Sequence, residues 1–200
     1  MKKFALIALC AAALLVLVAA SPAPASPSPA AAAVAAPAVP AFPLINNFEG
    51  KAETNSWKGG SSSITVAVSA EKFYGGAKSL KVDAAQKDYC GFALVLTPDQ
   101  TDWTGYAALK FWTLGTASGT SYNVYLEEDK GEQLLLGTVK DDSAGWKEVT
   151  MALADAKSRS DYQASTATVD GVLQYKMKTV QFAPNAGTMT FYIDDISLAK

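Results

Sequence analysis

Residues 191–198, which read Phe-Tyr-Ile-Asp-Asp-Ile-Ser-Leu, form the stretch that decides the fold. Aromatic and β-branched side chains dominate it, which predicts a strand that is paired and buried on at least one face. Successive side chains of a strand point to opposite faces, so Asp194 and Asp195 cannot both point into the core. A carboxylate is costly to bury unless a cationic group meets it. Either both carboxylates are solvated near the strand end, or one of them binds a hard cation such as calcium, which prefers oxygen ligands.

A candidate partner for these carboxylates lies at the other end of the predicted domain. Glu49 stands within residues 46–50, which read Asn-Asn-Phe-Glu-Gly. We expect the first and last strands of the domain to pair, so one ion could hold both ends of the fold together. The alternative is that Glu49 pairs with a lysine and Asp194 caps a turn, which would contribute little to stability.

The N-terminal segment does not belong to the predicted domain. A short basic start precedes an apolar run over residues 4–20, and small residues follow. This pattern predicts a secretory signal peptide over residues 1–20, cleaved after Ala20 or after Ala25. An uncleaved membrane anchor is the alternative, since the run is close to the length that spans a bilayer. The signal peptide predicts a protein that is secreted or resides in the periplasm or cell envelope.

A linker follows the apolar run. Residues 21–43 contain almost only Ala, Pro, Ser and Val. Repeated prolines exclude a regular helix, and few side chains are large enough to pack, so we predict an extended and semi-stiff segment. The folded part is therefore predicted over residues 44–200, a length suited to one domain.

The composition excludes several classes of function. Lys and Arg number 17 against 19 Asp and Glu, without a basic cluster, which argues against nucleic acid as a partner. The sequence has no histidine, which removes the usual nucleophile systems, most catalytic zinc sites and the usual general base. Outside the leader only Cys90 remains, and its apolar neighbours predict a buried thiol. Acidic residues at 127–129 and 141–142 could serve a glycosidase, but both groups adjoin turns, so we predict no enzyme.

Alternating apolar and polar residues, separated by turn residues, fill the predicted domain. The alternating runs lie at residues 63–68, 79–83, 90–96, 109–114, 122–127, 133–139, 146–153, 178–182 and 189–198. Only residues 152–158 suggest a turn of helix. About ten short strands in one domain predict an all-β fold, either a two-sheet antiparallel β-sandwich or a barrel.

Six short motifs, in order along the chain, carry a resemblance to a known family. They are residues 47–49 (Asn-Phe-Glu, followed by Trp57), 75–82 (Gly-Gly-Ala-Lys-Ser-Leu-Lys-Val), 102–106 (Asp-Trp-Thr-Gly-Tyr), 109–112 (Leu-Lys-Phe-Trp), 145–149 (Gly-Trp-Lys-Glu-Val) and 192–198 (Tyr-Ile-Asp-Asp-Ile-Ser-Leu). Together they resemble the β-jelly-roll carbohydrate-binding modules of the galactose-binding-like superfamily, especially the family 11 type and its relatives. The resemblance implies a jelly-roll sandwich without catalytic activity.

The resemblance also implies a structural calcium near the joined ends of the domain. Its side-chain ligands would be Glu49 and Asp194, and backbone carbonyls of Asn47, Gly75 and Lys78 would supplement them. Calcium takes several oxygen ligands in an irregular cage, which two carboxylates and turn carbonyls can supply.

The run at residues 122–127 (Tyr-Asn-Val-Tyr-Leu-Glu) is the candidate for sugar contact. Its alternation places Asn123, Tyr125 and Glu127 on one face, an aromatic ring between two polar groups that can hydrogen-bond to hydroxyls. A polar face with one tyrosine is also common on any sandwich exposed to water. The face is therefore a hypothesis for a binding site rather than an assignment.

Other aromatic and polar residues could join this face. Gln181 lies on another predicted strand, and Tyr175 lies in the loop before it. Trp112 must point away from Phe111, so it is a further candidate if Phe111 is in the core. The surroundings of Trp57 leave its exposure open, whereas Trp103 and Trp146 are predicted to pack in the core.

Two functions remain open from the sequence. The first is a secreted, non-catalytic carbohydrate-binding module that holds a polysaccharide, with a β-glucan as the leading candidate. The second is a structural or protein-interaction β-sandwich of the envelope, such as a periplasmic or sheath protein, with envelope proteins as partners. A small glycosidase is the least favoured.

Overall fold

The structure is a computed structural model that describes residues 43–200. The predicted signal peptide and residues 21–42 of the predicted linker lie outside the described residues. The described part has twelve strands and two short 3₁₀ helices, η1 and η2. They are β1 (Leu44–Asn46), β2 (Thr54–Gly59), β3 (Ser63–Ser69), β4 (Ser79–Gln86), β5 (Tyr89–Val95), η1 (Pro98–Gln100), β6 (Ala108–Leu114), β7 (Ser121–Glu128), β8 (Gln133–Lys140), β9 (Lys147–Ala152), η2 (Leu153–Asp155), β10 (Lys157–Ser158), β11 (Met177–Pro184) and β12 (Gly187–Ala199).

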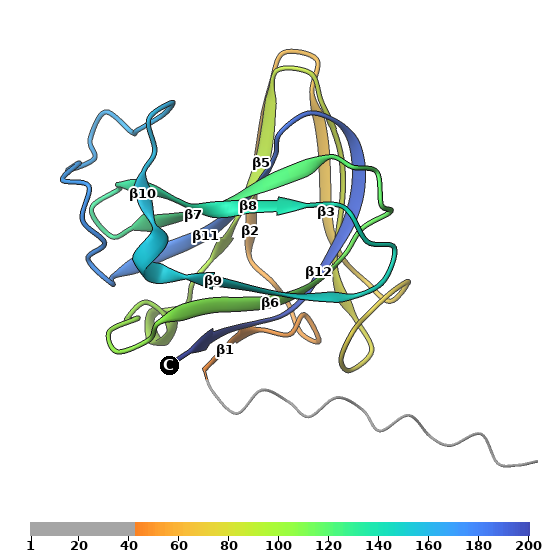
Figure 1. Ribbon diagram of the computed structural model, residues 1–200, viewed down its shortest axis with the longest axis horizontal. Coiled ribbons are helices and arrows are strands. Elements are labelled where there is room, and N and C mark those ends of the chain that lie inside the picture. Colours follow the sequence, from red (N-terminus) through yellow and green to blue (C-terminus); the bar gives the residue numbers. More distant parts are fainter. Residues whose placement is uncertain (1–42) are drawn as a thin grey trace, which may run out of the picture. The chain divides into compact units, whose positions relative to one another are not determined.

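The strands form two antiparallel sheets packed face to face (Figure 1). One sheet has the order β3-β4-β12-β6-β9, with β1 also paired to β12, and we call it the β12 sheet. The other has the order β10-β8-β7-β11-β5-β2, and we call it the β7 sheet. The prediction of an all-β, two-sheet antiparallel sandwich is confirmed. No helix within residues 43–200 is long and apolar enough to cross a membrane.

Strand β12 joins the two ends of the domain, as its sequence predicts. It pairs with β4 and β6, and its last residues pair with β1, where Leu44 lies opposite Ser197. The ladder between β12 and β6 shifts register between Asp194 and Ser197, and Asp195 has a positive φ of 46°. This bulge interrupts the simple alternation of faces that the sequence pattern assumes.

Aromatic side chains fill the space between the sheets. Phe92 stacks on Phe182 with ring centroids 5.2 Å apart, and Phe111 meets Phe182 edge-on at 5.6 Å. Trp103 is fully buried and donates from Nε1 to the Gln100 carbonyl at 2.8 Å. Cys90 is buried as well, as predicted, and burial raises the pKa of its thiol.

Two local expectations were wrong, and a third holds only in part. Strand β2 is absent from the alternating runs because Trp57 is its only large apolar residue. The expected helical turn at residues 152–158 is limited to η2, after which β10 adds a short edge to β8. Trp146 is only half-buried, with its ring 6.1 Å from that of Tyr74 in an edge contact, so it lies outside the core.

Candidate functional site

The outward face of the β7 sheet brings together four residues that the sequence singled out. Tyr125 lies opposite Gln181 in the ladder between β7 and β11, and Asn123 and Glu127 flank Tyr125 on the same face. Gln181 Nε2 donates to Glu127 Oε2 at 3.0 Å, and Asn123 Nδ2 donates to Tyr125 Oη at 2.9 Å. The polar groups of this face are therefore held in fixed positions by one another.

Arg159, which the sequence did not mark, covers the ring of Tyr125. Its guanidinium carbon lies 4.3 Å from the centroid of Tyr125 and 5.4 Å from that of Tyr162. Tyr125 is consequently only 5% exposed, whereas Tyr162 is 53% exposed. The expectation that Tyr125 offers an open stacking surface needs correction: Arg159 and Tyr162 form the accessible surface above it.

Small residues lie beside this cluster on the same face of the sheet. Ala93 is opposite Gln181, and Gly91 is opposite Trp57. The indole of Trp57 lies over Gly91 so closely that a Cβ at Gly91 would be 2.6 Å from Trp57 Cζ2. A large side chain at position 91 would therefore fill the space that the indole occupies.

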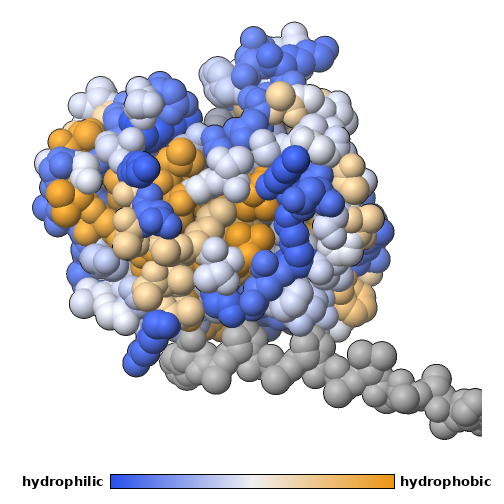
Figure 2. Space-filling view, viewed as in Figure 1, coloured by the Kyte–Doolittle hydropathy of each residue, from blue (hydrophilic) through white to orange (hydrophobic). Residues whose placement is uncertain are grey.

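Aromatic residues stand on both sides of these small residues. On one side of Gly91 and Ala93, Trp57 lies on β2 and Tyr89, which is 59% exposed, lies on β5. Arg159 and Tyr162 lie in the loop after β10, at the other side. Figure 2 shows a notch in the surface between the lobe formed by that loop and the lobe formed by the β2–β3 and β4–β5 turns. We call the outward face between these two sides the groove face.

The charges on the groove face are paired. Lys178 Nζ lies 2.9 Å from Glu127 Oε1, and Arg159 Nε lies 2.7 Å from Asp161 Oδ1. Lys178 and Asp161 are largely exposed, whereas their partners are more covered. The face therefore offers hydrogen-bonding groups without a large excess of either charge.

Buried acidic side chains fasten the loop that carries Arg159 and Tyr162. Glu132 is fully buried and accepts hydrogen bonds from the backbone of Asp170 and Gly171. Glu128 is 1% exposed and accepts one from the Gln174 backbone at 2.5 Å. Burial raises the pKa of Glu128, and the negative charges of Glu132, Asp170 and Asp129 raise it further.

Glu128→Gln should stabilise the protein at neutral pH. The raised pKa means that the charged form of Glu128 costs folding free energy. This cost is absent below the pKa of the unfolded state, grows as the pH rises toward the pKa of the folded state, and is complete above it. Glutamine keeps an oxygen for the Gln174 amide and removes the charge. Thermal melting should show a gain of a few degrees at pH 8 that shrinks at pH 4. A loss of stability at pH 8 would contradict this assignment.

Two predicted contact residues lie away from the groove face. Trp112 is on β6 in the β12 sheet and stacks on Tyr74, with ring centroids 3.6 Å apart, so it belongs to the opposite face of the sandwich. Tyr175 packs against the core with a positive φ of 57°, and its carbonyl accepts a hydrogen bond from the Trp103 backbone at 2.9 Å. The structure therefore brings neither residue to the face of Tyr125. For Trp112 the reason is that alternation along one strand does not tell which sheet the strand joins.

The predicted metal residues gather around the loop between β3 and β4. Glu49 Oε1 accepts hydrogen bonds from the backbone of Ala77 at 2.7 Å and Lys78 at 2.9 Å, which lower the pKa of Glu49. The side chain of Asn47 accepts one from the Glu49 backbone at 3.4 Å. In the part of the chain that the structure describes, no three Asp, Glu, Cys or His side chains form a group that could hold a metal ion.

Asp194, the predicted calcium ligand, accepts backbone hydrogen bonds from the β3–β4 loop. Its Oδ2 accepts hydrogen bonds from the backbone of Tyr74 at 2.8 Å and Gly75 at 3.2 Å, and its Oδ1 accepts one from Asp195 at 2.9 Å. It is fully buried, and burial raises its pKa to about 6 despite these donors. Asp194 thus ties the β3–β4 loop to β12.

Asp195 also lies near Glu49. Burial and the negative charge of Glu49 raise the pKa of Asp195. A Cβ at Gly75 would lie 2.8 Å from Asp195 Oδ2, and one at Gly76 would lie 2.2 Å from Glu49 Oε1. The two glycines therefore form a cradle into which both carboxylates reach, and a cation between them would relieve their repulsion.

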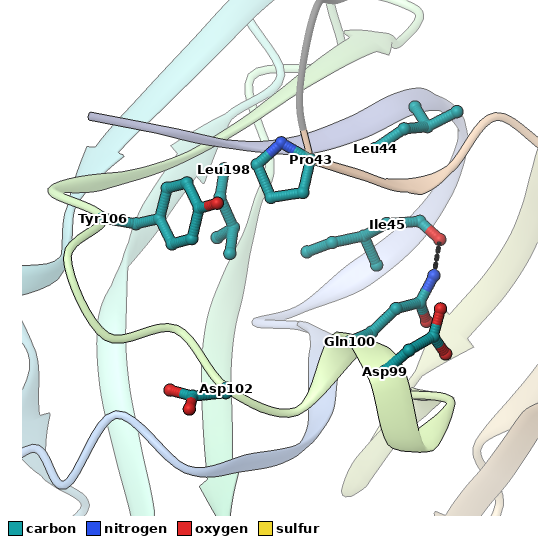
Figure 3. A pocket seen from close by; sticks show the side chains of 8 residues that line it. All are labelled: Pro43, Leu44, Ile45, Asp99, Gln100, Asp102, Tyr106 and Leu198. Atoms are coloured by element: carbon teal, nitrogen blue, oxygen red, sulfur yellow. Dashed lines mark hydrogen bonds between the residues drawn. The ribbon is translucent and has the colours of Figure 1, made fainter.

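A separate pocket of about 400 Å³ lies beside β1 and η1 (Figure 3). Its lining combines an apolar wall of Ile45, Tyr106 and Leu198 with the carboxylates of Asp99 and Asp102. The side chain of Gln100 crosses it and donates to the Ile45 carbonyl at 2.6 Å. None of the predicted site residues lines this pocket.

Comparison with known proteins agrees with this architecture. The family 11 module of the cellulosomal cellulase Lic26A-Cel5E of Clostridium thermocellum matches with a TM-score of 0.66 and 21% identity, over 78% of this chain and 93% of that one. The Clostridium thermocellum family 11 module in complex with a β-1,3-1,4-mixed-linked tetrasaccharide matches with a TM-score of 0.66 and 20% identity, over 78% and 94%. A family 30 module of the cellulosomal cellulase Cel9D-Cel44B of the same organism matches with a TM-score of 0.53 and 15% identity, over 79% and 92%.

No curated protein matches the sequence. The model of the family described as "Carbohydrate binding domain (family 11)" matches residues 26–200, which is most of the chain. The chain therefore belongs to the family 11 carbohydrate-binding domains.

Proposed function

We propose that this protein is a non-catalytic module that holds a neutral polysaccharide along the groove face. The observation that supports it best is a strip of small residues, Gly91 and Ala93, between aromatic side chains on either side. Sugar rings present flat apolar faces that stack on aromatic rings, and Trp57, Tyr89 and Tyr162 can supply them. Asn123, Glu127, Gln181 and Arg159 supply hydrogen bonds for hydroxyl groups.

The paired charges favour a neutral ligand over an acidic one. Arg159 already pairs with Asp161, and Lys178 with Glu127. A uronic acid would have to compete with these carboxylates and would lie close to their negative charge. A β-glucan is the leading candidate, because a similar module has been determined with a mixed-linkage β-glucan tetrasaccharide.

Gel retardation with soluble polysaccharides tests this function. Mixed-linkage β-glucan should slow the protein in a native gel, and polygalacturonate should not. Xylan and mannan in parallel gels would define the preference among neutral glycans. Absence of retardation with every glycan, combined with co-purification of envelope proteins, would favour the alternative of an envelope interaction module and overturn the proposal.

Gly91→Ala should weaken glycan binding by about tenfold. The new Cβ would collide with the Trp57 indole and would lie 2.9 Å from the Phe182 carbonyl, so the indole must leave its position over the sheet. Isothermal titration with the glycan that causes retardation measures the change. Gly145→Ala is the control, since the nearest atom to its Cβ is 3.8 Å away, and it should bind normally. Equal affinity of Gly91→Ala and wild type would contradict the placement of Trp57 in the site.

We also propose a structural calcium at the cradle of Gly75 and Gly76. Glu49 and Asp195 would hold it through carboxylate oxygens, and backbone carbonyls of the surrounding turns would complete its ligands. Bound calcium would neutralise two carboxylates that now repel each other, and would stabilise the junction of β1, β12 and the β3–β4 loop. Asp195 takes the place of Asp194 in this proposal because the oxygens of Asp194 accept three backbone hydrogen bonds.

The place of action proposed for this module is outside the cytoplasm. The support is the predicted signal peptide over residues 1–20 and the Ala/Pro/Ser-rich linker over residues 21–43. Such a linker would let the domain reach a polysaccharide away from its point of attachment.

A further inference from the structure

The pocket beside β1 and η1, which we call the β1–η1 pocket, has walls that backbone hydrogen bonds hold in place. The Pro43 carbonyl accepts from the Leu198 backbone at 3.1 Å, which fixes β1 against the end of β12. The Tyr106 backbone donates to the Trp103 carbonyl at 3.1 Å, which closes the turn that carries the Tyr106 ring. The pocket therefore exists before a ligand enters it, and its volume of about 400 Å³ fits a small group.

One side of the β1–η1 pocket is apolar and the other is polar. Figure 3 shows the side chains of Ile45, Leu198 and Tyr106 along one side, with Asp99, Gln100 and Asp102 along the other. Ile45 and Leu198 are otherwise buried in the core, so an apolar group in the pocket would cover the part of their surface that still faces solvent. Such burial is favourable, and the wall therefore fits methylene groups.

The amide of Gln100 is already used by the protein. Its Nε2 donates to the Ile45 carbonyl at 2.6 Å, and its Oε1 accepts from the Thr97 backbone N–H at 3.0 Å. The side chain is thus fixed at both of its polar atoms. On the polar side of the pocket, the carboxylates are the groups that remain for a ligand.

These two carboxylates give the pocket an excess of negative charge. Asp102 pairs with Lys176, which holds the pKa of Asp102 well below its usual range. Asp99 takes part in no ion pair within residues 43–200. The Thr97 hydroxyl donates to Asp99 Oδ1 at 2.6 Å and lowers the pKa of Asp99, so this side chain is charged at neutral pH. One negative charge at the pocket is therefore left without a cation.

We propose that the β1–η1 pocket binds a lysine side chain of a partner polypeptide, with its methylene groups against the apolar wall and its ammonium beside Asp99 and Asp102. A lysine joins a flexible chain of four carbons to a compact positive charge, and it can bury the chain while the charge stays near water. Both carboxylates are exposed, so the side chain can enter while the partner's backbone stays outside. The pocket is formed by β1, η1, the end of β12 and the segment before β6, away from the groove face, and this site is independent of glycan binding.

Three probes of equal chain length test the pocket by NMR titration of the full chain: n-butylammonium, 1-butanol and butyrate. Butylammonium should shift the methyl signals of Ile45 and Leu198 until they saturate. Butanol should bind roughly fivefold more weakly, because an exposed ion pair adds up to about that factor, and butyrate should not bind. Sodium chloride at high concentration should weaken the binding of butylammonium and leave that of butanol unchanged. Equal affinity for butylammonium and butanol, or no saturable shift, would overturn the proposal.

Asp99→Asn should weaken the binding of butylammonium by roughly threefold and leave that of butanol unchanged. Asparagine keeps an oxygen for the Thr97 hydroxyl, so the variant should retain the fold of the pocket. Asp142→Asn is the matched control, since Asp142 is an exposed carboxylate that pairs with Lys147 on another part of the surface, and it should bind like wild type. An Asp99→Asn variant with unchanged affinity for butylammonium would contradict the role of its charge.

Peptides show whether the ligand is a side chain of a polypeptide. Acetyl-Ala-Lys-Ala-amide should shift the same two methyl signals at least as strongly as butylammonium, and acetyl-Ala-Gln-Ala-amide should not. A pocket that binds butylammonium but not the lysine peptide would overturn the assignment to a partner polypeptide. The indole N–H signal of Trp57 should stay in place throughout, so failure of this site would leave the proposed glycan binding untouched.

Discussion

Trp57→Ala should lose glycan binding by roughly 30- to 100-fold in isothermal titration, a loss of about 2–3 kcal/mol. Trp57 is the one tryptophan on the groove face in the described part of the chain, and its indole lies over Gly91, where a flat sugar face can stack on it. Truncation to alanine removes that surface and leaves the strand pairing of β2 and β5 unchanged. The melting temperature should therefore change little.

Trp146→Ala is the matched control for this prediction. Trp146 is half-buried as well, but its contact is with Tyr74, which stacks on Trp112 of the β12 sheet. Its removal should leave glycan affinity within about twofold of wild type. If Trp146→Ala lost binding and Trp57→Ala retained it, the site would have to be on the other sheet.

Asp194→Ala should lower the free energy of unfolding by about 2–4 kcal/mol, measured by denaturant titration at pH 7.5. The substitution leaves the backbone N–H groups of Tyr74, Gly75 and Asp195 without their acceptor. It also detaches the β3–β4 loop, where Glu49 meets Ala77 and Lys78. The loss should appear with chelator present, because it does not depend on a metal.

Asp195→Ala should lower stability mainly when calcium is present, in contrast to Asp194→Ala. With chelator present it should cost less than Asp194→Ala, because removal of a carboxylate that Glu49 repels partly offsets the strain of an alanine at positive φ. Excess calcium should raise the melting temperature of wild type and leave that of Asp195→Ala unchanged. A calcium response that survives Asp195→Ala and disappears in Asp194→Ala would reverse the assignment of the two carboxylates.

The strands of the sandwich were predictable wherever apolar and polar residues alternate. The stretch at 191–198 predicts β12, and its pairing with β1 follows from the expectation that both ends of the fold meet. The sequence pattern did not predict strand β2, because its residues, Thr-Asn-Ser-Trp-Lys-Gly, are mostly polar and lie at a sheet edge. Edge strands with an open face carry little apolar signal.

The groove face was predictable only in part, for a similar reason. Asn123, Tyr125 and Glu127 share a face by alternation, and the structure joins Gln181 to them. Arg159 and Tyr162 lie in a polar segment whose sequence indicates a surface loop, and only the packing of that loop shows them over Tyr125.

The choice between Asp194 and Asp195 depends on the bulge in β12. A regular strand places neighbouring residues on opposite faces, which leaves either carboxylate able to meet Glu49. The positive φ of Asp195 and the shifted register direct it toward Gly75, while Asp194 receives the loop amides. Such backbone irregularities are set by the complete ladder and cannot be deduced from the Asp-Asp pair alone.

The most direct test of the groove face is a titration followed through the four tryptophan indole N–H resonances. Trp57 lies on the β7 sheet, Trp103 is in the core, and Trp112 and Trp146 lie on the side of the β12 sheet. Addition of a mixed-linkage β-glucan oligosaccharide should shift the Trp57 signal strongly and leave the other three in place. A shift of Trp112 and Trp146 with Trp57 unmoved would contradict the account.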